Sequence, residues 1–109
     1  MNKRKPVTRK IFDRILKTGK TYHQPLFSFH TLHTLENVYR IVCVVPKSTE
    51  KSAVVRNKLR RRCYYAIYKL LNNNKYFLAI LFIKSGAKRL PYKLFEEKIA
   101  VLLKRSGIL

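Results

Sequence analysis

The spacing of apolar positions predicts a first helix over residues 9–17. Thr8 is a favourable N-cap because its hydroxyl oxygen can accept hydrogen bonds from the free N–H groups of the first turn. Val7 and Phe12 stand at the positions of a hydrophobic staple. We expect Gly19 to end this helix in a left-handed conformation. The apolar stripe of the helix consists of Ile11, Phe12, Ile15 and Leu16.

Residues 26–35 alternate in the way that an extended strand does. The alternation places Phe27 and Phe29 on one face of the strand and Ser28 and His30 on the other. If the two phenylalanines belong to the core, His30 faces outward. It is then either a structural or solvated histidine, or a residue that lines a binding groove.

Two nearly continuous apolar runs, residues 38–45 and 76–83, are typical of strands that are covered on both faces. The polar pair at 36–37 predicts a turn before the first of them. A helical segment over residues 52–71 separates the two runs, so we expect them to pair in parallel. Residues 46–51 form the loop that enters this helix.

The helix predicted over residues 52–71 has two distinct sides. The side that we expect to face the core carries Val55, Leu59, Cys63, Ala66 and Leu70. The opposite side carries Arg56, Asn57, Arg60, Arg61 and Tyr64. A triple asparagine at 72–74 ends the helix.

A last helix is predicted over residues 91–105, with Gly107 as its stop and Phe95, Ile99, Leu102 and Leu103 as its apolar face. Together these elements predict an α/β fold, a two-layer sandwich of one small mixed sheet of about four strands and three helices. We expect the order α-β-β-(β)-α-β-α in a single domain over residues 1–109, with residues 1–7 as a flexible basic tail.

Charge adds the first information about function. The chain has 25 Lys and Arg against 5 Asp and Glu, a net charge of +20. Repulsion on this scale destabilises a compact protein and is usually offset by a polyanionic partner. We expect this partner to be nucleic acid, with an acidic membrane surface or an acidic protein as the alternatives.

The cysteines and the N-terminus indicate the compartment. Cys43 and Cys63 lie in apolar settings without metal-ligand spacing, so we expect buried free thiols and a reducing environment. The apolar runs are too short to span a bilayer, and no signal-peptide pattern follows Met1. We therefore expect a cytoplasmic protein that does not bind membranes.

The basic side of the helix at 52–71 is the best candidate for binding chemistry. The planar guanidinium of arginine contacts phosphate through two hydrogen bonds and stacks on bases. Asn57 can read a base edge or a 2′-hydroxyl, and the helix N-terminus attracts anions. A solvated basic helix would explain the charge, but it would not explain so strict a separation of the two sides.

An independent nuclease is not expected. Protein-only RNA hydrolysis needs paired acid and base groups or carboxylates that hold metal ions. The five acids show no metal-ligand pattern, and His30 and His33 point to opposite faces of one strand. We expect no catalytic residue and no metal site in this chain.

At residues 53–61 the sequence resembles the signature of the protein subunit of bacterial ribonuclease P. That signature is a basic helix that opens with an Arg-Asn pair, is followed by a Lys/Arg pair and has an alanine a few residues upstream. Residues 12–19 resemble the first helix of the family and its closing glycine. Residues 27–32 resemble its early strand, and residues 39–47 the strand that enters a lysine-containing loop.

This resemblance implies a partner, a catalytic RNA that removes the 5′ leader of precursor tRNA with Mg²⁺ ions held by the RNA. It implies that the protein binds this RNA and the leader and needs no protein partner. It also implies a left-handed crossover between the parallel strands. By position, the RNA-binding residues would be Lys47, Arg56, Asn57, Lys58, Arg60, Arg61 and Tyr64. The residues that line the leader cleft would be Phe12, Leu16, Ser28 and His30.

Five positions depart from the usual pattern of the family. Pro46 and Ser48 flank Lys47 where small and basic residues are usual. Tyr64 stands where a further basic residue is usual, and Leu16 and His30 stand where aromatic residues are common. The main alternative function is a ribosomal or other basic RNA-binding protein without a role in cleavage. A cationic DNA or membrane binder is a weaker alternative, because no free-standing amphipathic segment is present.

Overall fold

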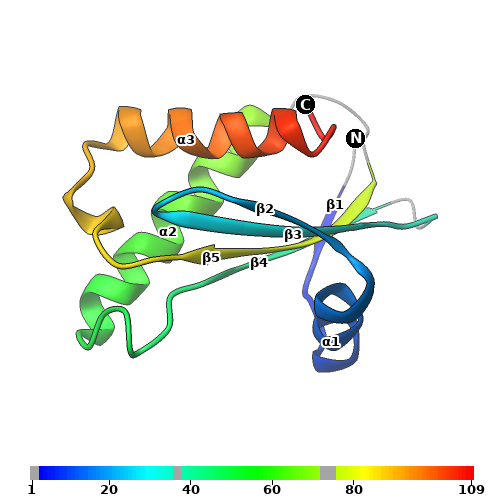
Figure 1. Cartoon of the computed structure of the whole chain (residues 1–109), viewed down its shortest axis with the longest axis horizontal. Coiled ribbons are helices and arrows are strands. Elements are labelled where there is room, and N and C mark those ends of the chain that lie inside the picture. The colour runs from blue at the N-terminus through cyan, green and yellow to red at the C-terminus, as the bar shows by residue number, and fades with distance from the viewer. Residues whose placement is uncertain (1–2, 36–37, 72–75) are drawn as a thin grey trace.

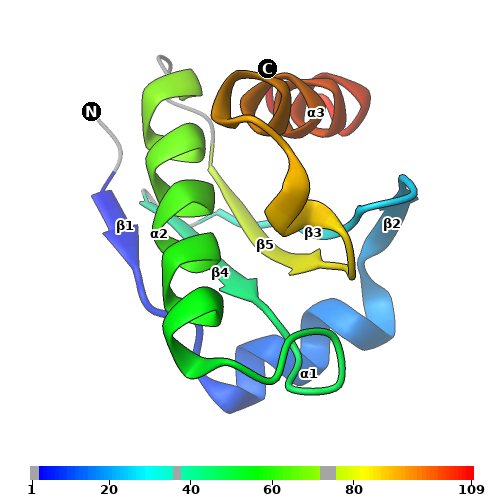
Figure 2. The same ribbon diagram turned by 90° about the vertical axis from the view of Figure 1, so that its left-hand side faces the viewer.

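The computed structural model describes residues 3–35, 38–71 and 76–109, and it contains one mixed five-stranded sheet in the order β1-β4-β5-β3-β2. Helix α1 lies against one face of this sheet, and helices α2 and α3 cover the other (Figures 1 and 2). The elements are β1 (Lys3–Lys5), α1 (Arg9–Thr18), β2 (Lys20–His23), β3 (Phe27–His33), β4 (Val38–Val44), α2 (Ala53–Leu70), β5 (Phe77–Ile83), the 3₁₀ turn η1 (Ala87–Arg89) and α3 (Tyr92–Arg105).

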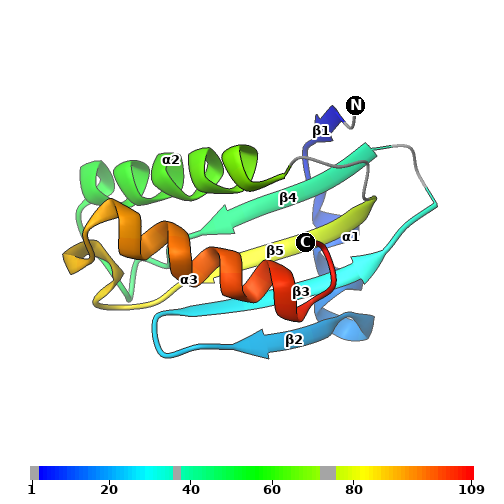
Figure 3. The same ribbon diagram turned by 90° about the horizontal axis from the view of Figure 1, so that it is seen from above.

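The strand pairing confirms the predicted α/β class. Strands β4 and β5, which α2 connects in the sequence, pair directly and in parallel. Strand β3 pairs antiparallel with both β5 and β2. In Figure 3 both parallel strands run to the left, and the chain returns through α2 on the side of α3, which makes the crossover left-handed. Ser52 caps α2 as the polar loop ends, because its side chain accepts a hydrogen bond from the Val55 N–H.

Two of the five strands carry no apolar alternation in the sequence. Lys3–Lys5 pairs with the first residues of β4, inside the segment that we expected to be a tail. Lys20–His23 follows α1 directly and pairs with β3. Both strands are short and polar and lie at the edges of the sheet, where backbone pairing rather than burial defines them.

The prediction for Gly19 is wrong in its conformation. Its φ of −76° and ψ of 164° are extended rather than left-handed. A Cβ at this position would lie 2.6 Å from the carbonyl oxygen of Ile15 and 2.7 Å from that of Thr31. Glycine is therefore required because the chain passes between the end of α1 and strand β3, where no side chain fits.

The main core lies between the sheet and helices α2 and α3. Phe27 and Phe29 of β3 meet the apolar stripe of α3, and Phe27 and Phe95 make an edge-to-face contact at 5.2 Å. Cys43 and Cys63 are buried there as free thiols, as predicted. The predicted stop of α3 is also confirmed, because Gly107 has a φ of 83°.

The other face of the sheet is only partly covered, so the prediction that β4 is covered on both faces is wrong. Ile15 of α1 is buried against Leu78 and Ile80 of β5, but Val42 and Val44 of β4 remain half-buried. Helix α1 has 10 residues and cannot cover five strands. The turn at 36–37 and the asparagines at 72–74 lie outside the described residues.

Candidate nucleic-acid interface

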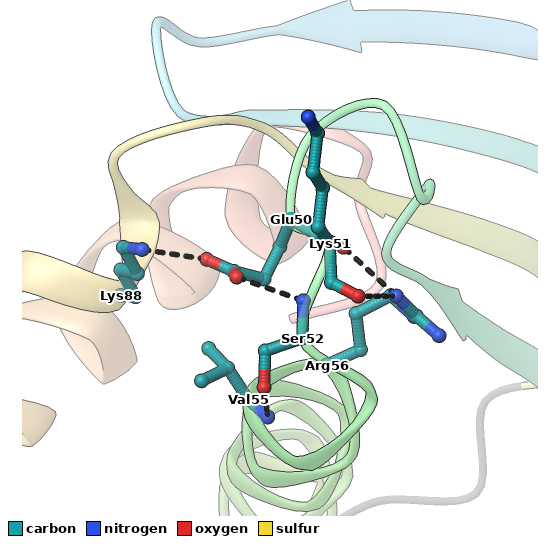
Figure 4. Close-up of polar contacts among 6 residues, drawn as sticks. All are labelled: Glu50, Lys51, Ser52, Val55, Arg56 and Lys88. Atoms are coloured by element: carbon teal, nitrogen blue, oxygen red, sulfur yellow. Dashed lines mark hydrogen bonds and ion pairs between the residues drawn. The ribbon is translucent and has the colours of Figure 1, made fainter.

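A compact polar cluster fixes the N-terminus of α2 (Figure 4). Glu50 accepts a hydrogen bond from the Ser52 N–H at 3.1 Å through one oxygen, and its other oxygen pairs with the Lys88 ammonium at 2.6 Å. The hydrogen bond from Lys88, followed by that from Ser52, lowers the pKa of Glu50 below its ordinary value. The carboxylate thus ties the start of α2 to the η1 turn.

Arg56 belongs to this cluster rather than to a free basic surface. Its Nη1 donates to the backbone carbonyls of Glu50 at 2.9 Å and Lys51 at 2.8 Å, as Figure 4 shows. The side chain is half-buried. The prediction that Arg56 projects from the helix with the other basic residues is therefore only partly correct, since one edge of its guanidinium holds the loop against the helix.

The next turns of α2 form the basic side that the sequence predicted. Asn57, Arg60, Arg61 and Tyr64 line a surface hollow of about 450 Å³ together with Val54. Arg60 donates a hydrogen bond to the Asn57 side-chain oxygen, which orients both groups. Within residues 3–35, 38–71 and 76–109, neither Arg60 nor Arg61 makes an ion pair with a carboxylate. We call this hollow the basic hollow.

Tyr64 links the basic hollow to the sheet. Its hydroxyl oxygen accepts a hydrogen bond from the Cys43 N–H at 3.0 Å, and its ring packs against the main core. Strand β1 pairs with β4 only at residues 38–40. Tyr64 therefore satisfies a backbone donor of β4 beyond the reach of β1.

The structure places two further predicted residues away from this hollow. Lys47 is exposed on the loop after β4. Lys58 is exposed on the other side of α2, where it lies beside Arg62 and Lys88. The basic surface of α2 therefore continues around the helix toward η1 and α3.

On the partly covered face of the sheet, three rings form a continuous row, which we call the open face row. Phe12 of α1 contacts Phe82 of β5 edge-to-face at 6.3 Å, and Phe82 contacts His30 of β3 at 5.3 Å. Phe82 was not among the predicted residues, because a continuous apolar strand does not reveal which side chains stay half-exposed. The available signal was strand alternation, which places Phe82 on the same face of β5 as Leu78 and Ile80.

His30 is held between two hydroxyl groups. Its Nδ1 lies 3.0 Å from Thr21 Oγ1 and its Nε2 lies 3.1 Å from Ser28 Oγ. Burial, and next the charge of His23, lower the pKa of His30 below its ordinary value. Neutral imidazole suits this site because each hydroxyl can donate or accept, whichever the tautomer requires.

The four residues predicted to line a cleft are not equally placed. Phe12, Ser28 and His30 lie on this face of the sheet, and their role in binding stays a prediction. Leu16 is 45% exposed and does not join the apolar cluster around Ile15.

Membrane-spanning helices and metal-binding clusters were sought among the described residues. None of their helices is long and apolar enough to cross a membrane. Across the same ranges there is no group of three or more His, Cys, Asp or Glu side chains that could hold a metal ion.

Known proteins resemble this chain over most of its length. Residues 1–107 match the model of the family described as Ribonuclease P. A protein from Prochlorococcus marinus named "Ribonuclease P protein component" is 31% identical to this chain, and the match covers 79% of this chain and 80% of that protein.

Solved structures share the fold. A Staphylococcus aureus RNase P protein mutant with defective mRNA degradation activity has a TM-score of 0.84 at 21% identity, with 94% of this chain and 87% of that chain covered. The RNase P protein from Thermotoga maritima has a TM-score of 0.78 at 24% identity, with 89% and 92% covered. The family model and the Prochlorococcus relative carry the assignment: this chain belongs to the ribonuclease P protein family and is a subunit of the endoribonuclease that acts in tRNA processing.

Proposed function

We propose that this chain binds the catalytic RNA of ribonuclease P through the basic hollow of α2 and binds the 5′ leader of precursor tRNA across the open face row. In this way it assists the metal-dependent removal of the leader by the RNA. The observation that carries the proposal is the gathering of Asn57, Arg60 and Arg61 in one surface hollow of a protein with a net charge of +20. Among the described residues, neither arginine has a carboxylate partner.

The basic hollow has the chemistry of an RNA-docking surface. Arg60 is oriented by Asn57, and Arg61 lies beside them on the rim of the same hollow. Guanidinium groups that are held in place lose less conformational entropy when they contact phosphate. The hydrogen bonds at Glu50, Ser52 and Lys51 fix the first turn of α2, and so they support the position of the whole basic side.

The open face row has the chemistry of a single-strand site. Half-buried aromatic rings can stack on unpaired bases without reading a particular sequence. Phe12, Phe82 and His30 provide such rings on one surface. Because the pKa of His30 is lowered, the imidazole is neutral at physiological pH and offers stacking and hydrogen bonds rather than charge.

The Mg²⁺ ions of the reaction are expected to be held by the RNA. The protein contributes positive charge near the phosphates and a surface for the leader, and it supplies no hydrolytic group. Cytoplasmic localisation stays a prediction from the sequence.

The test is reconstitution with a bacterial ribonuclease P RNA at low Mg²⁺ concentration. We expect the wild-type protein to restore cleavage of precursor tRNA at the mature 5′ end, because its cations reduce the need for free Mg²⁺ near the phosphates. The double variant Arg60→Ala/Arg61→Ala should require a higher protein concentration for the same rate. Cleavage that does not respond to folded wild-type protein would contradict the proposal.

The alternative, a basic RNA-binding protein without a role in cleavage, predicts a different result. Such a protein would bind the ribonuclease P RNA and transfer RNA with similar affinities and would leave the cleavage rate unchanged. Measuring binding and cleavage in the same preparation separates the two functions.

A further inference from the structure

A second recessed surface lies on the side of α2 that faces α3. It is a hollow of about 370 Å³ lined by Lys58, Arg61, Arg62, Tyr65 and Tyr92, which we call the tyrosine hollow. Only Arg61 is shared with the basic hollow, so the two lie on either side of this residue. The function proposed above uses the basic hollow and the open face row and does not involve the two tyrosines.

The two tyrosine rings form a pair at the junction of the helices. Their centroids are 5.8 Å apart and their planes are inclined at 54°. Tyr65 is 59% exposed although it lies on a helix whose other side forms the core, so much of its ring is available to a ligand. Tyr92 is half-buried at the first residue of α3, and this position fixes the orientation of the pair.

The charges around the pair are positive. Lys58 and Arg61 are exposed, and Arg62 is half-buried and donates to the backbone carbonyl of Leu90 at 3.4 Å. No acidic residue lines the tyrosine hollow among the residues that the structure describes. Glu96 lies near Tyr92, but it pairs with Lys69 at 3.4 Å.

An exposed aromatic ring, paired with a half-buried one and placed between cations, matches the chemistry of an unpaired nucleotide. The base stacks on a ring, and the phosphates that flank it contact the cations. An acidic peptide would use the cations but would leave the rings without a function. A lipid surface would need a broader apolar patch than one pair of rings provides.

We propose that the tyrosine hollow binds one unpaired nucleotide of the catalytic RNA, with the base stacked on Tyr65 and the adjacent phosphates near Lys58 and Arg61. This inference rests on the proposed function, because it assumes that α2 is seated on that RNA. It adds a second contact, on the opposite side of Arg61 from the basic hollow.

The test compares three variants of the full chain for binding to ribonuclease P RNA. Tyr65→Ala should weaken binding about tenfold, because stacking on one base is lost. Tyr65→Phe keeps the ring and should bind like the wild type. Tyr68→Ala removes a 73% exposed tyrosine of the same helix that does not line the hollow, and it should have no effect.

A footprint of the RNA by 2′-hydroxyl acylation locates the contact. The wild type and Tyr65→Phe should protect at least one unpaired nucleotide that becomes reactive with Tyr65→Ala. Urea denaturation of each variant verifies that the folds are intact.

Two results would overturn the inference: equal binding by Tyr65→Ala and the wild type, or an equal loss with Tyr68→Ala. In either case the wild type still binds the RNA and stimulates cleavage, so the proposed function stands. If the wild type itself fails to stimulate cleavage, the proposed function is the part that fails.

Discussion

The two faces of the sheet are built from the same strands but differ in how completely they are covered. Under α2 and α3, Phe27 and Phe29 are 0% and 1% exposed and meet a continuous apolar core. On the opposite face, α1 buries Ile15 against β5, while Phe82 and His30 stay half-exposed. The face under α2 and α3 therefore provides most of the core that stabilises the fold. The face under α1 leaves aromatic side chains partly exposed to solvent.

The first test removes one phenylalanine from each side of the sheet, Phe95 of α3 on the closed side and Phe82 of β5 on the open side. Phe95→Ala should lower the free energy of unfolding by about 3–5 kcal/mol, because it leaves a cavity in the closed core. Phe82→Ala should lower it by about 1–2 kcal/mol, because its ring is half-exposed. Urea denaturation measures both, and equal losses would show that the open face is also core.

A second test addresses the ligand of the open face. Phe12→Ala should weaken the binding of precursor tRNA to the reconstituted enzyme by about 1–3 kcal/mol, the value of stacking on one base. The control is mature tRNA, which lacks the leader and should bind equally well to the wild type and the variant. If both RNAs lose affinity to the same extent, Phe12 supports the fold and does not contact the leader.

A third test measures the electrostatic part of RNA binding and compares two arginines of α2. Arg60→Ala should reduce the slope of log affinity against log salt concentration by about 0.7–0.9, the contribution of one phosphate contact. Arg56→Ala should reduce it less, because the guanidinium of Arg56 is already bonded to two backbone carbonyls. Salt titration of RNA binding measures the slopes, and an unchanged slope would remove Arg60 from the contact surface.

The smallest expected effect concerns pH. The pKa of His30 is lowered in the folded protein, so as the pH falls below 6.5 the unfolded chain takes up the proton first. The free energy of unfolding should therefore fall between pH 6.5 and the lowered pKa, and His30→Gln should remove this part of the decrease. His33→Gln, on the same strand, is the control for the loss of an imidazole. Identical pH profiles for His30→Gln and the wild type would contradict the burial of His30.

Periodicity in the sequence was sufficient for the elements that bury an apolar side. The stripes of α2 and α3 and the alternation of Phe27 and Phe29 with Ser28 and His30 all predicted the observed faces. The basic side of α2 followed from the same pattern, because apolar spacing on one side defines the other. The fold class and most of the basic hollow could therefore be predicted.

The remaining features depend on neighbours that are distant in the sequence. Gly19 is required by the carbonyl oxygen of Thr31 on another strand. Phe82 stays half-exposed because α1 is short, and Arg56 is bonded to backbone carbonyls because the preceding loop folds back on it. A local sequence pattern does not indicate how far a helix extends over a sheet or where a loop places its carbonyl groups.

The hydrogen bond from the Cys43 amide to Tyr64 has a practical consequence. The protection of this backbone proton depends on one side chain at the surface rather than on a neighbouring strand. Its chemical shift and its exchange rate in deuterated solvent should therefore respond when a molecule occupies the adjacent hollow. The amide of Cys43 is thus a natural NMR probe of occupancy, without any label attached to the basic residues.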